Sequence, residues 1–186
     1  PIGIWLQDGA GKMTFVNRAF CESMGIAEES FFAVPHYAEL MPEEFRPQCL
    51  ASDAKALASQ GISVTHQQLP LVDGKIHDLR VIKAVKRDAQ GKPESLVGLS
   101  FDITEEVQRE RALKESEEIF NKAFNISPTM ISITTADEGK IIDINETFCK
   151  TLGYKREECI GHTTSELNVW ADTKQRDQTI KMVKNE

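Results

Sequence analysis

The sequence lacks the features that mark several classes of protein. No apolar stretch approaches the roughly 20 residues of a membrane-spanning helix, so no direct membrane insertion is expected. Lys and Arg number 22 against 29 Asp and Glu, which gives a formal net charge of −7. Binding to phosphates needs clustered cations, so no nucleic-acid partner is expected.

Cysteine is scarce, and the sequence opens without the basic-then-apolar pattern expected of a leader. The chain has 4 cysteines in 186 residues, too few for a disulfide scaffold. Cys21 and Cys149 occur in similar apolar contexts and are interpreted as reduced core thiols, which favours a cytoplasmic location. The chain opens without Met, directly at an apolar run, and we therefore expect it to be part of a larger protein.

Signatures of catalysis are absent from the sequence as well. It contains no Gly-rich phosphate loop, no metal-ligand cluster and no activated-nucleophile arrangement, so we expect no enzyme activity. Asp53 has no evident partner. The basic run from Lys83 to Arg87 alternates with apolar residues, which predicts the solvated face of a strand.

What the sequence does contain is an internal repeat. Residues 17–25 read NRAFCESMG and residues 145–153 read NETFCKTLG, so Asn, Phe, Cys and Gly coincide at one offset. An apolar run, a turn with Gly and a second apolar run precede each copy. A repeat longer than a hundred residues has the size of a domain. The chain is therefore interpreted as a tandem of one module.

The first copy has the pattern of an α+β domain. Alternating apolar residues and turn signals predict a hairpin over residues 2–16, with Asn17 as the N-cap of a short helix. Helical spacing predicts a helix over residues 47–60. Three strands follow, over residues 63–71, 75–87 and 95–101, with Asp73-Gly74 as a hairpin turn. Clustered hairpins predict a five-stranded antiparallel sheet with helices on one face.

A charged segment without Gly or Pro joins the two copies. It predicts a helix over residues 104–124, with an imperfect heptad seam that leaves open a weak coiled coil or a solvated connector. The expected organisation is a first domain over residues 1–103, a linker helix over 104–125 and the N-terminal part of a second domain over 126–186. The second copy has no counterpart of the three later strands, so we expect an uncovered apolar face led by four residues: Ile131, Ile133, Ile142 and Ile144.

Two sets of motifs resemble one family. The first is Gly11-Lys12-Met13 followed by Asn17-x-x-Phe20 and Gly25, which recurs in the second copy; the other is Asp102-Ile103-Thr104-Glu105 at the end of the last strand. Together they resemble PAS sensory domains. The resemblance implies a small pocket between the sheet and its helices, and a place in a signalling protein such as a sensor histidine kinase or a diguanylate cyclase. Neither output signature occurs in this chain.

The candidate site residues follow from the pattern and the resemblance. We expect the pocket to be lined by residues that alternation and helical spacing point inward: Ile4, Leu6, Phe20, Cys49, Leu50, Leu57, Val97 and Leu99. Asp102 has Glu105 three residues on, the spacing of a capping box, and is predicted to be a helix N-cap. The resemblance implies that Asp102, Ile103 and Thr104 relay the signal.

Cofactors receive little support from the residues. Oxygen-sensing haem PAS domains carry a proximal His in the helix that we expect over residues 47–60. That helix has no His here, and Cys49 stands at about its position; a thiolate can ligate haem, but most helix cysteines are small hydrophobes. Flavin-binding relatives carry Asn-Cys-Arg-Phe, which does not occur here, although Trp5 would be able to stack on a ring system. The cofactor is therefore unknown, and none is the leading expectation.

Two functions remain open at this point. In one, the chain is a cytoplasmic sensory module that binds a small ligand, or senses indirectly, and signals through residues 102–125 to a separate output domain. In the other, the sheet and linker helix form a homodimer and no ligand is bound.

Overall fold

The computed structural model describes residues 1–170. A five-stranded antiparallel sheet has the order β2-β1-β5-β4-β3, which confirms the predicted fold class. The strand bounds are β1 Ile2–Asp8, β2 Met13–Val16, β3 Ser63–Pro70, β4 Ile76–Arg87 and β5 Pro93–Asp102. Gly74 has a φ of 75° in the β3–β4 turn, the left-handed conformation that an Asp-Gly hairpin turn favours.

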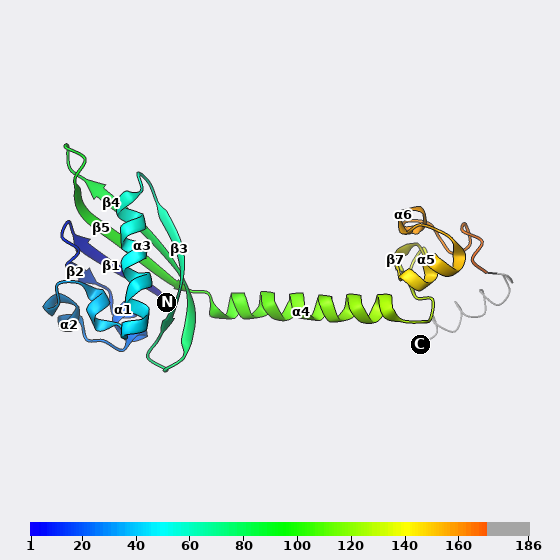
Figure 1. Ribbon diagram of the computed structural model, residues 1–186, viewed down its shortest axis with the longest axis horizontal. Helices are drawn as coiled ribbons and strands as arrows, with labels where there is room; N and C mark the ends of the chain where they lie inside the picture. Colours follow the sequence, from blue (N-terminus) through cyan, green and yellow to red (C-terminus); the bar gives the residue numbers. More distant parts are fainter. Residues whose placement is uncertain (171–186) are drawn as a thin grey trace. The chain divides into compact units, whose positions relative to one another are not determined.

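The helices of the first copy lie between β2 and β3 in sequence and pack over one face of the sheet (Figure 1). Their bounds are α1 Arg18–Met24, α2 Glu28–Ala33, η1 Tyr37–Leu40, η2 Glu43–Phe45 and α3 Arg46–Ala58. Asn17 caps α1 as predicted, because its side chain accepts a hydrogen bond from the Phe20 N–H. The core between helices and sheet is therefore made by the covered face of the strands.

The covered face of β1 and β5 is the opposite of the predicted one. Gly3, Trp5 and Gln7 point into the core, whereas Leu6 is 37% exposed. On β5 the buried positions are Leu96 and Gly98. Four strand residues that were predicted to point inward lie half-buried or exposed on the other face, so their prediction was wrong: Ile4, Leu6, Val97 and Leu99. The reason is that both faces of β1 carry apolar residues, so alternation alone does not choose between them.

Helix α3 is likewise rotated by about one position from the expected orientation. Leu50 and Leu57 are exposed by 48% and 41%, so their prediction as pocket residues was wrong. The buried stripe has the same helical spacing but consists of Cys49, Ser52, Asp53 and Ala56. The helix turns a carboxylate inward because a buried cation on the sheet pairs with it.

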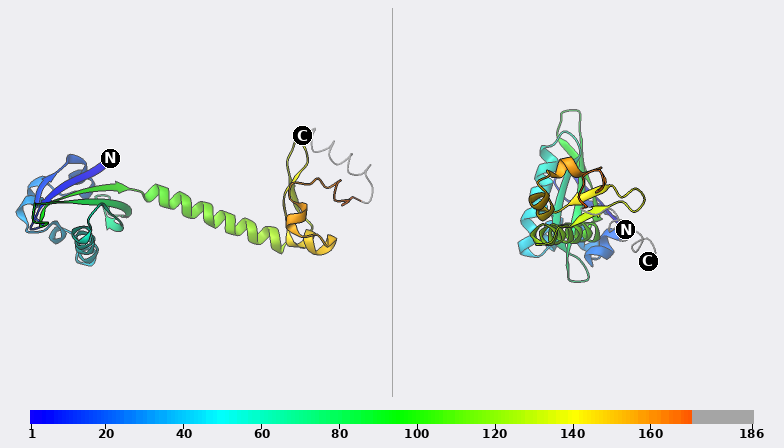
Figure 2. Two further views of the ribbon diagram at one scale, coloured as in Figure 1. Left: turned by 90° about the horizontal axis from the view of Figure 1, so that it is seen from above. Right: turned by 90° about the vertical axis from the view of Figure 1, so that its right-hand side faces the viewer.

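Helix α4 spans Thr104–Ile126, 23 residues, and continues without a break (Figure 2). The chain divides into two compact units, residues 1–111 and the residues from 112 onward, so the division falls within this helix. Among residues 1–170, no helix combines the length and the apolar character that crossing a membrane requires.

The second unit repeats the hairpin and the first helix. Its elements are β6 Ser132–Thr134, β7 Ile141–Ile144, α5 Glu146–Leu152 and α6 Arg156–Cys159. Its core is a small cluster of four buried residues: Ile141, Ile144, Phe148 and Cys159. The expected uncovered face is only partly present, because Ile144 is buried whereas Ile133 and Ile142 are exposed. Residues 171–186, which were expected to continue this copy, lie outside the described residues.

Candidate functional site

A buried ion pair lies at the centre of the first unit. The Lys83 side chain comes from β4, is 1% exposed, and contacts the Asp53 carboxylate on α3. Lys83 Nζ also donates to Ser52 Oγ at 2.9 Å, and Ser52 Oγ lies 3.0 Å from Thr65 Oγ1. A buried charge is costly unless it is paired and hydrogen-bonded, and these contacts meet that condition for Lys83.

The second Asp53 oxygen has its own donors. His36 Nε2 lies 3.0 Å from Asp53 Oδ2, and Gln7 Nε2 donates to the same atom at 3.4 Å. His36 Nδ1 accepts the Ala38 N–H at 3.1 Å, so the ring hydrogen that faces Asp53 is on Nε2. His36 is the most exposed member of this group, with 23% of its side chain accessible. We call Gln7, His36, Ser52, Asp53 and Lys83 the polar cluster.

Aromatic rings form the wall around the polar cluster. Trp5 stacks on Phe20 with ring centroids 4.9 Å apart and lies 6.3 Å from Tyr37. Lys83 Nζ is 5.7 Å from the Trp5 ring and 5.9 Å from the Tyr37 ring, within the range of cation–π attraction. Trp5 can lie flat because its β5 neighbour is Gly98, where a Cβ atom would collide with the indole. Within the described residues 1–170, the buried Trp5 Nε1 has no hydrogen-bond partner.

The electrostatics of the cluster are set by burial. Desolvation lowers the pKa of Lys83, and the neighbouring Asp53 carboxylate opposes this shift by stabilising the charged form. Burial also raises the pKa of the Cys49 thiol, which lies next to the cluster on α3. A thiolate haem ligand needs the charged form, so this position does not favour haem ligation by Cys49. Within residues 1–170, no group of three His, Cys, Asp or Glu side chains is arranged to hold a metal ion.

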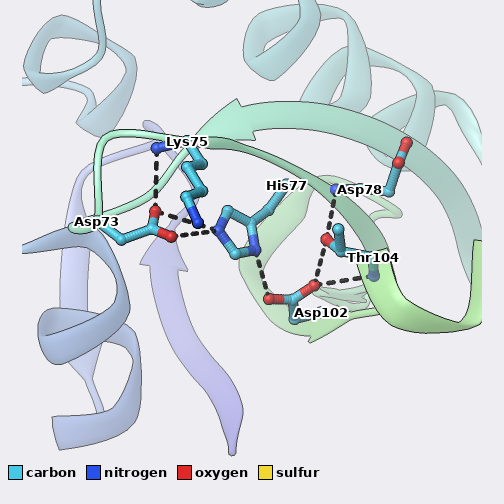
Figure 3. A network of polar contacts seen from close by, with 6 residues as sticks. All are labelled: Asp73, Lys75, His77, Asp78, Asp102 and Thr104. Atoms are coloured by element: carbon cyan, nitrogen blue, oxygen red, sulfur yellow. Dashed lines mark hydrogen bonds and ion pairs between the residues drawn. The ribbon is translucent and has the colours of Figure 1, made fainter. Parts of the chain in front are cut away.

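A second network lies where β5 becomes α4 (Figure 3). Asp102 Oδ1 accepts hydrogen bonds from the Thr104 N–H at 2.9 Å and the Thr104 hydroxyl at 2.6 Å. Thr104 Oγ1 in turn accepts the Asp78 N–H at 2.9 Å, and the Ile103 N–H donates to the Asp78 carbonyl at 2.9 Å. The start of α4 is therefore fastened to β4 through backbone and side-chain bonds. We call Asp78, Asp102, Ile103 and Thr104 the joint.

Asp102 was predicted to be the helix N-cap, and that detail was wrong. Helix α4 begins at Thr104, and the Val107 N–H donates to the Ile103 carbonyl, so Ile103 occupies the capping position. Asp102 instead closes a short turn by binding Thr104. The expected contact between Asp102 and Glu105 is replaced by an ion pair between Glu105 and Arg109. Ile103 itself is buried, which anchors the chain at the point where the strand ends.

His77 joins this network from β4 (Figure 3). Its Nδ1 lies 2.7 Å from Asp102 Oδ2 and its Nε2 lies 3.1 Å from Asp73 Oδ1 in the β3–β4 turn. Burial lowers the pKa of His77, but hydrogen bonds and charge from Asp73 and Asp102 outweigh it, and the net pKa is raised. For Asp102, burial raises the pKa, and bonds from Thr104 and His77 outweigh this and lower it.

The predicted site residues thus fall into three groups. Phe20 and Cys49 lie in the core beside the polar cluster. The relay residues Asp102, Ile103 and Thr104 lie together, whereas the other six predicted pocket residues do not reach the core. Sequence reasoning missed Lys83, Asp53 and His77. Lys83 was predicted to lie on the solvated face of a strand. The alternation on β4 nevertheless indicates that it shares a face with two apolar residues, Leu79 and Val81, and with His77.

Family models match both units. One described as "PAS fold" matches residues 1–108, which is more than half of the chain, and one described as "PAS domain" matches residues 118–183. A solved structure, the sensory box histidine kinase/response regulator from Burkholderia thailandensis, has a TM-score of 0.50 at 20% identity. The match covers 65% of this chain and 91% of that chain. At this identity, the likeness shows the fold alone.

Curated relatives are sensor proteins. The chain is 32% identical over 112 residues to the two-component sensor PprA of Pseudomonas aeruginosa, which is 60% of this chain and 12% of that protein. It is 25% identical over 118 residues to the C4-dicarboxylate transport sensor protein DctS of Rhodobacter capsulatus, which is 63% of this chain and 18% of that protein. The chain spans less than a fifth of the length of either relative.

Proposed function

This chain belongs to the PAS domain family, and from that premise we propose that its first unit perceives a stimulus at the polar cluster and signals through the joint to α4. The unit is a PAS sensory domain. What its perception site responds to is proposed from the residues alone. The core holds a buried cation, a buried carboxylate and an indole N–H that has no partner within residues 1–170, so we propose a small polar molecule as the stimulus in place of an apolar one.

One observation carries the proposal: a single strand holds both networks. Residues on β4 alternate so that His77, Leu79, Val81 and Lys83 share the helix-covered face. Lys83 belongs to the polar cluster, and His77 is bonded to Asp102 of the joint. A shift of β4 at Lys83 would therefore displace the start of α4 through the packed side chains between them.

The output of this pathway lies in another part of the protein. We infer that α4 passes the change to a separate kinase or cyclic-di-nucleotide synthase domain, for which the much greater length of the sensor relatives leaves room. The module itself catalyses no reaction in this proposal. Its location is proposed to be the cytoplasm, where all four cysteines, which are free, would remain reduced.

The relay is tested by neutralising the polar cluster without emptying it. In the double variant Lys83→Met/Asp53→Leu, both charges are replaced by apolar groups of similar volume, a change that cores often tolerate. We expect hydrogen exchange of the α4 amides over residues 104–111 to change relative to the unaltered chain. The matched control is Lys86→Met/Glu94→Leu, which removes an exposed ion pair on the same two strands that carry the joint.

The outcome is decided by the contrast between the two double variants. If α4 exchange is the same in both as in the unaltered chain, the polar cluster is not coupled to the helix and the proposed relay is wrong.

The class of ligand is identified by a separate experiment. Native mass spectrometry and an absorption spectrum of the purified chain report a bound mass or a chromophore.

The uncovered sheet face favours a second function, homodimerisation without a ligand. Leu6, Phe15 and Val97 are exposed on β1, β2 and β5, although they are large and apolar. A second copy of the chain would bury them. The variant Val97→Glu should then turn a dimer into a monomer in light scattering, whereas Val72→Glu, in the distant β3–β4 turn, should not. An unchanged mass for Val97→Glu would rule out this face as the interface.

A further inference from the structure

His77 is held between two carboxylates in a way that only its charged form satisfies. Its Nδ1 faces Asp102 at 2.7 Å and its Nε2 faces Asp73 at 3.1 and 3.3 Å. A neutral imidazole has one N–H donor and one acceptor, whereas a carboxylate only accepts. Neutral His77 can therefore keep one of these bonds, and the other becomes a contact between a lone pair and an anion.

The two carboxylates belong to different parts of the fold. Asp73 lies in the β3–β4 turn, where its Oδ1 also accepts the Lys75 N–H at 3.0 Å. Asp102 lies at the end of β5, where its other oxygen binds Thr104. His77 is thus the side chain that ties the β3–β4 turn to the joint at the start of α4, as Figure 3 shows.

The same turn also contacts the helical layer. The Val72 N–H donates to the Ser23 carbonyl on α1 at 2.9 Å. A Cβ atom on Gly25, which ends α1, would lie 2.8 Å from the Val72 side chain, so the two are in close contact. Loosening the turn would therefore change how the end of α1 is held. Because His77 links the turn to Asp102, a change in the joint would also change the contact between Val72 and the end of α1.

Few other charges surround His77. Lys75 neighbours Asp73 in the turn. On β4, the Asp78 carboxylate is held by Gln68 of β3 at 2.9 Å. On α4, Glu106 pairs with Arg80, and Glu105 pairs with Arg109. Asp73 and Asp102 are therefore the anions that act directly on the imidazole.

We infer that His77 is a proton-operated clamp: when charged it holds the β3–β4 turn to the joint, and when neutral it keeps Asp102 and releases Asp73. The direction follows from the distances, because the Asp102 contact is the shorter and its carboxylate is already fixed by Thr104. This role lies beyond the proposed relay from the polar cluster and does not depend on it.

The raised pKa of His77 sets the sign of the pH effect. The clamp is fully engaged below the ordinary value of 6.5 and is lost as pH rises through the raised value. Above that value, opening of the turn becomes more frequent, by about tenfold for each unit by which the pKa in the closed state exceeds that in the open state.

Nuclear magnetic resonance of the whole chain tests the inference directly. We expect His77 to titrate above 6.5, and its neutral form to carry the proton on Nδ1, the tautomer that keeps the Asp102 bond. Exchange at Leu71 and Val72, corrected for the intrinsic pH dependence, should accelerate through the same titration.

Two variants separate the clamp from general effects of pH. In His77→Gln, which is neutral at every pH, the corrected exchange of the turn should no longer follow pH. In His66→Gln, an exposed position on the neighbouring strand β3, the exchange should follow pH as in the unaltered chain. The inference is overturned if His77 titrates at or below 6.5, if its neutral form carries the proton on Nε2, or if turn exchange is independent of its titration.

Discussion

The two copies of the repeat use the same asparagine in different surroundings. Asn17 Oδ1 accepts the N–H groups of Ile4 and Phe20, and its Nδ2 donates to the Ile2 carbonyl. Asn145 Oδ1 makes the equivalent pair of bonds, but its Nδ2 donates to two carbonyls, one of them Phe124 in α4. Asn145 is completely buried, whereas Asn17 is only half-buried. The shared motif therefore builds the corner between hairpin and helix, and the second copy also uses it to hold the end of α4.

The interiors of the two copies differ much more than their corners. Trp5 pairs with Val16 in the first copy, and the residue that pairs with the equivalent Ile144 in the second copy is Ser132. Trp5 is a wall of the polar cluster, whereas Ser132 is exposed. The two copies thus share the corner motif, whereas every polar-cluster residue except Gln7 lies outside the repeated hairpin and first helix.

The largest expected effect breaks the first copy alone. The variant Asp53→Ala leaves Lys83 buried without its counter-ion, and we expect it to cost about 3–5 kcal/mol of stability in residues 1–111. Denaturant-dependent hydrogen exchange should report this loss there and no change from residue 112 onward. Lys83→Met/Asp53→Leu is the control and should recover most of the stability. Equal losses in the single and double variants would mean that volume, not unpaired charge, is what matters.

The asparagine corner gives the next largest effect and sharpens the comparison. We expect Asn145→Ala to cost about 2–3 kcal/mol, because buried backbone groups lose their partners. Asn17→Ala should cost about 1–2 kcal/mol, near the value of an N-cap. Only Asn145→Ala should speed amide exchange at the end of α4. Equal costs in the two copies would contradict the difference in burial.

A smaller effect is expected at the joint. Asp102→Ala removes an acceptor for Thr104 and a partner of His77, and we expect a loss of about 1 kcal/mol, comparable to that of a helix cap. Faster exchange in the first turn of α4 should accompany it, and signal output should change in the full-length protein. Thr104→Ser keeps the hydroxyl and serves as the control. Unchanged exchange and unchanged output would leave Asp102 without a role in the relay.

The smallest expected effect belongs to the second copy. Arg156 lowers the pKa of Asp143 by a 2.8 Å hydrogen bond. This contribution is present above the ordinary carboxyl pKa of 3.8 and is lost as pH falls through the lowered value. Arg156→Ala should therefore destabilise this copy by about 0.5 kcal/mol at neutral pH, and the difference should vanish in acid. A difference that persists in strong acid would point to lost packing instead.

The sequence predicted the elements better than the faces they present. Turn chemistry such as Asp73-Gly74 placed the strands within a few residues, because local hairpin geometry depends on local residues. The face of β1 was reversed because Ile4 and Trp5 are both apolar, so the pattern had no preferred side. For α3, Leu50 and Leu57 formed an apolar stripe at helical spacing and were predicted to be buried, but both are exposed.

The polar contacts were harder still to predict. Lys83 and Asp53 are 30 residues apart, and nothing local to either residue indicates that they are partners. Each alone resembles a solvated charge, and only the fold brings them together in the core. The joint was found because its motif resembles that of a family, but the bonds from Asp78 and His77 depend on the sheet register, in which Leu79 pairs with Asp102.

The position of Trp5 gives the first unit an optical probe of its own. The indole lies 5.7 Å from a buried ammonium and is stacked on Phe20, and its N–H has no hydrogen-bond partner in the part of the chain that the structure describes. Indole emission responds to nearby charge and to hydrogen bonding, so its wavelength should register any molecule that moves Lys83 or accepts from Nε1. The chain has 2 tryptophans, and the other is Trp170. Trp170→Phe would leave Trp5 as the single emitter, which makes ligand screening possible without an attached dye.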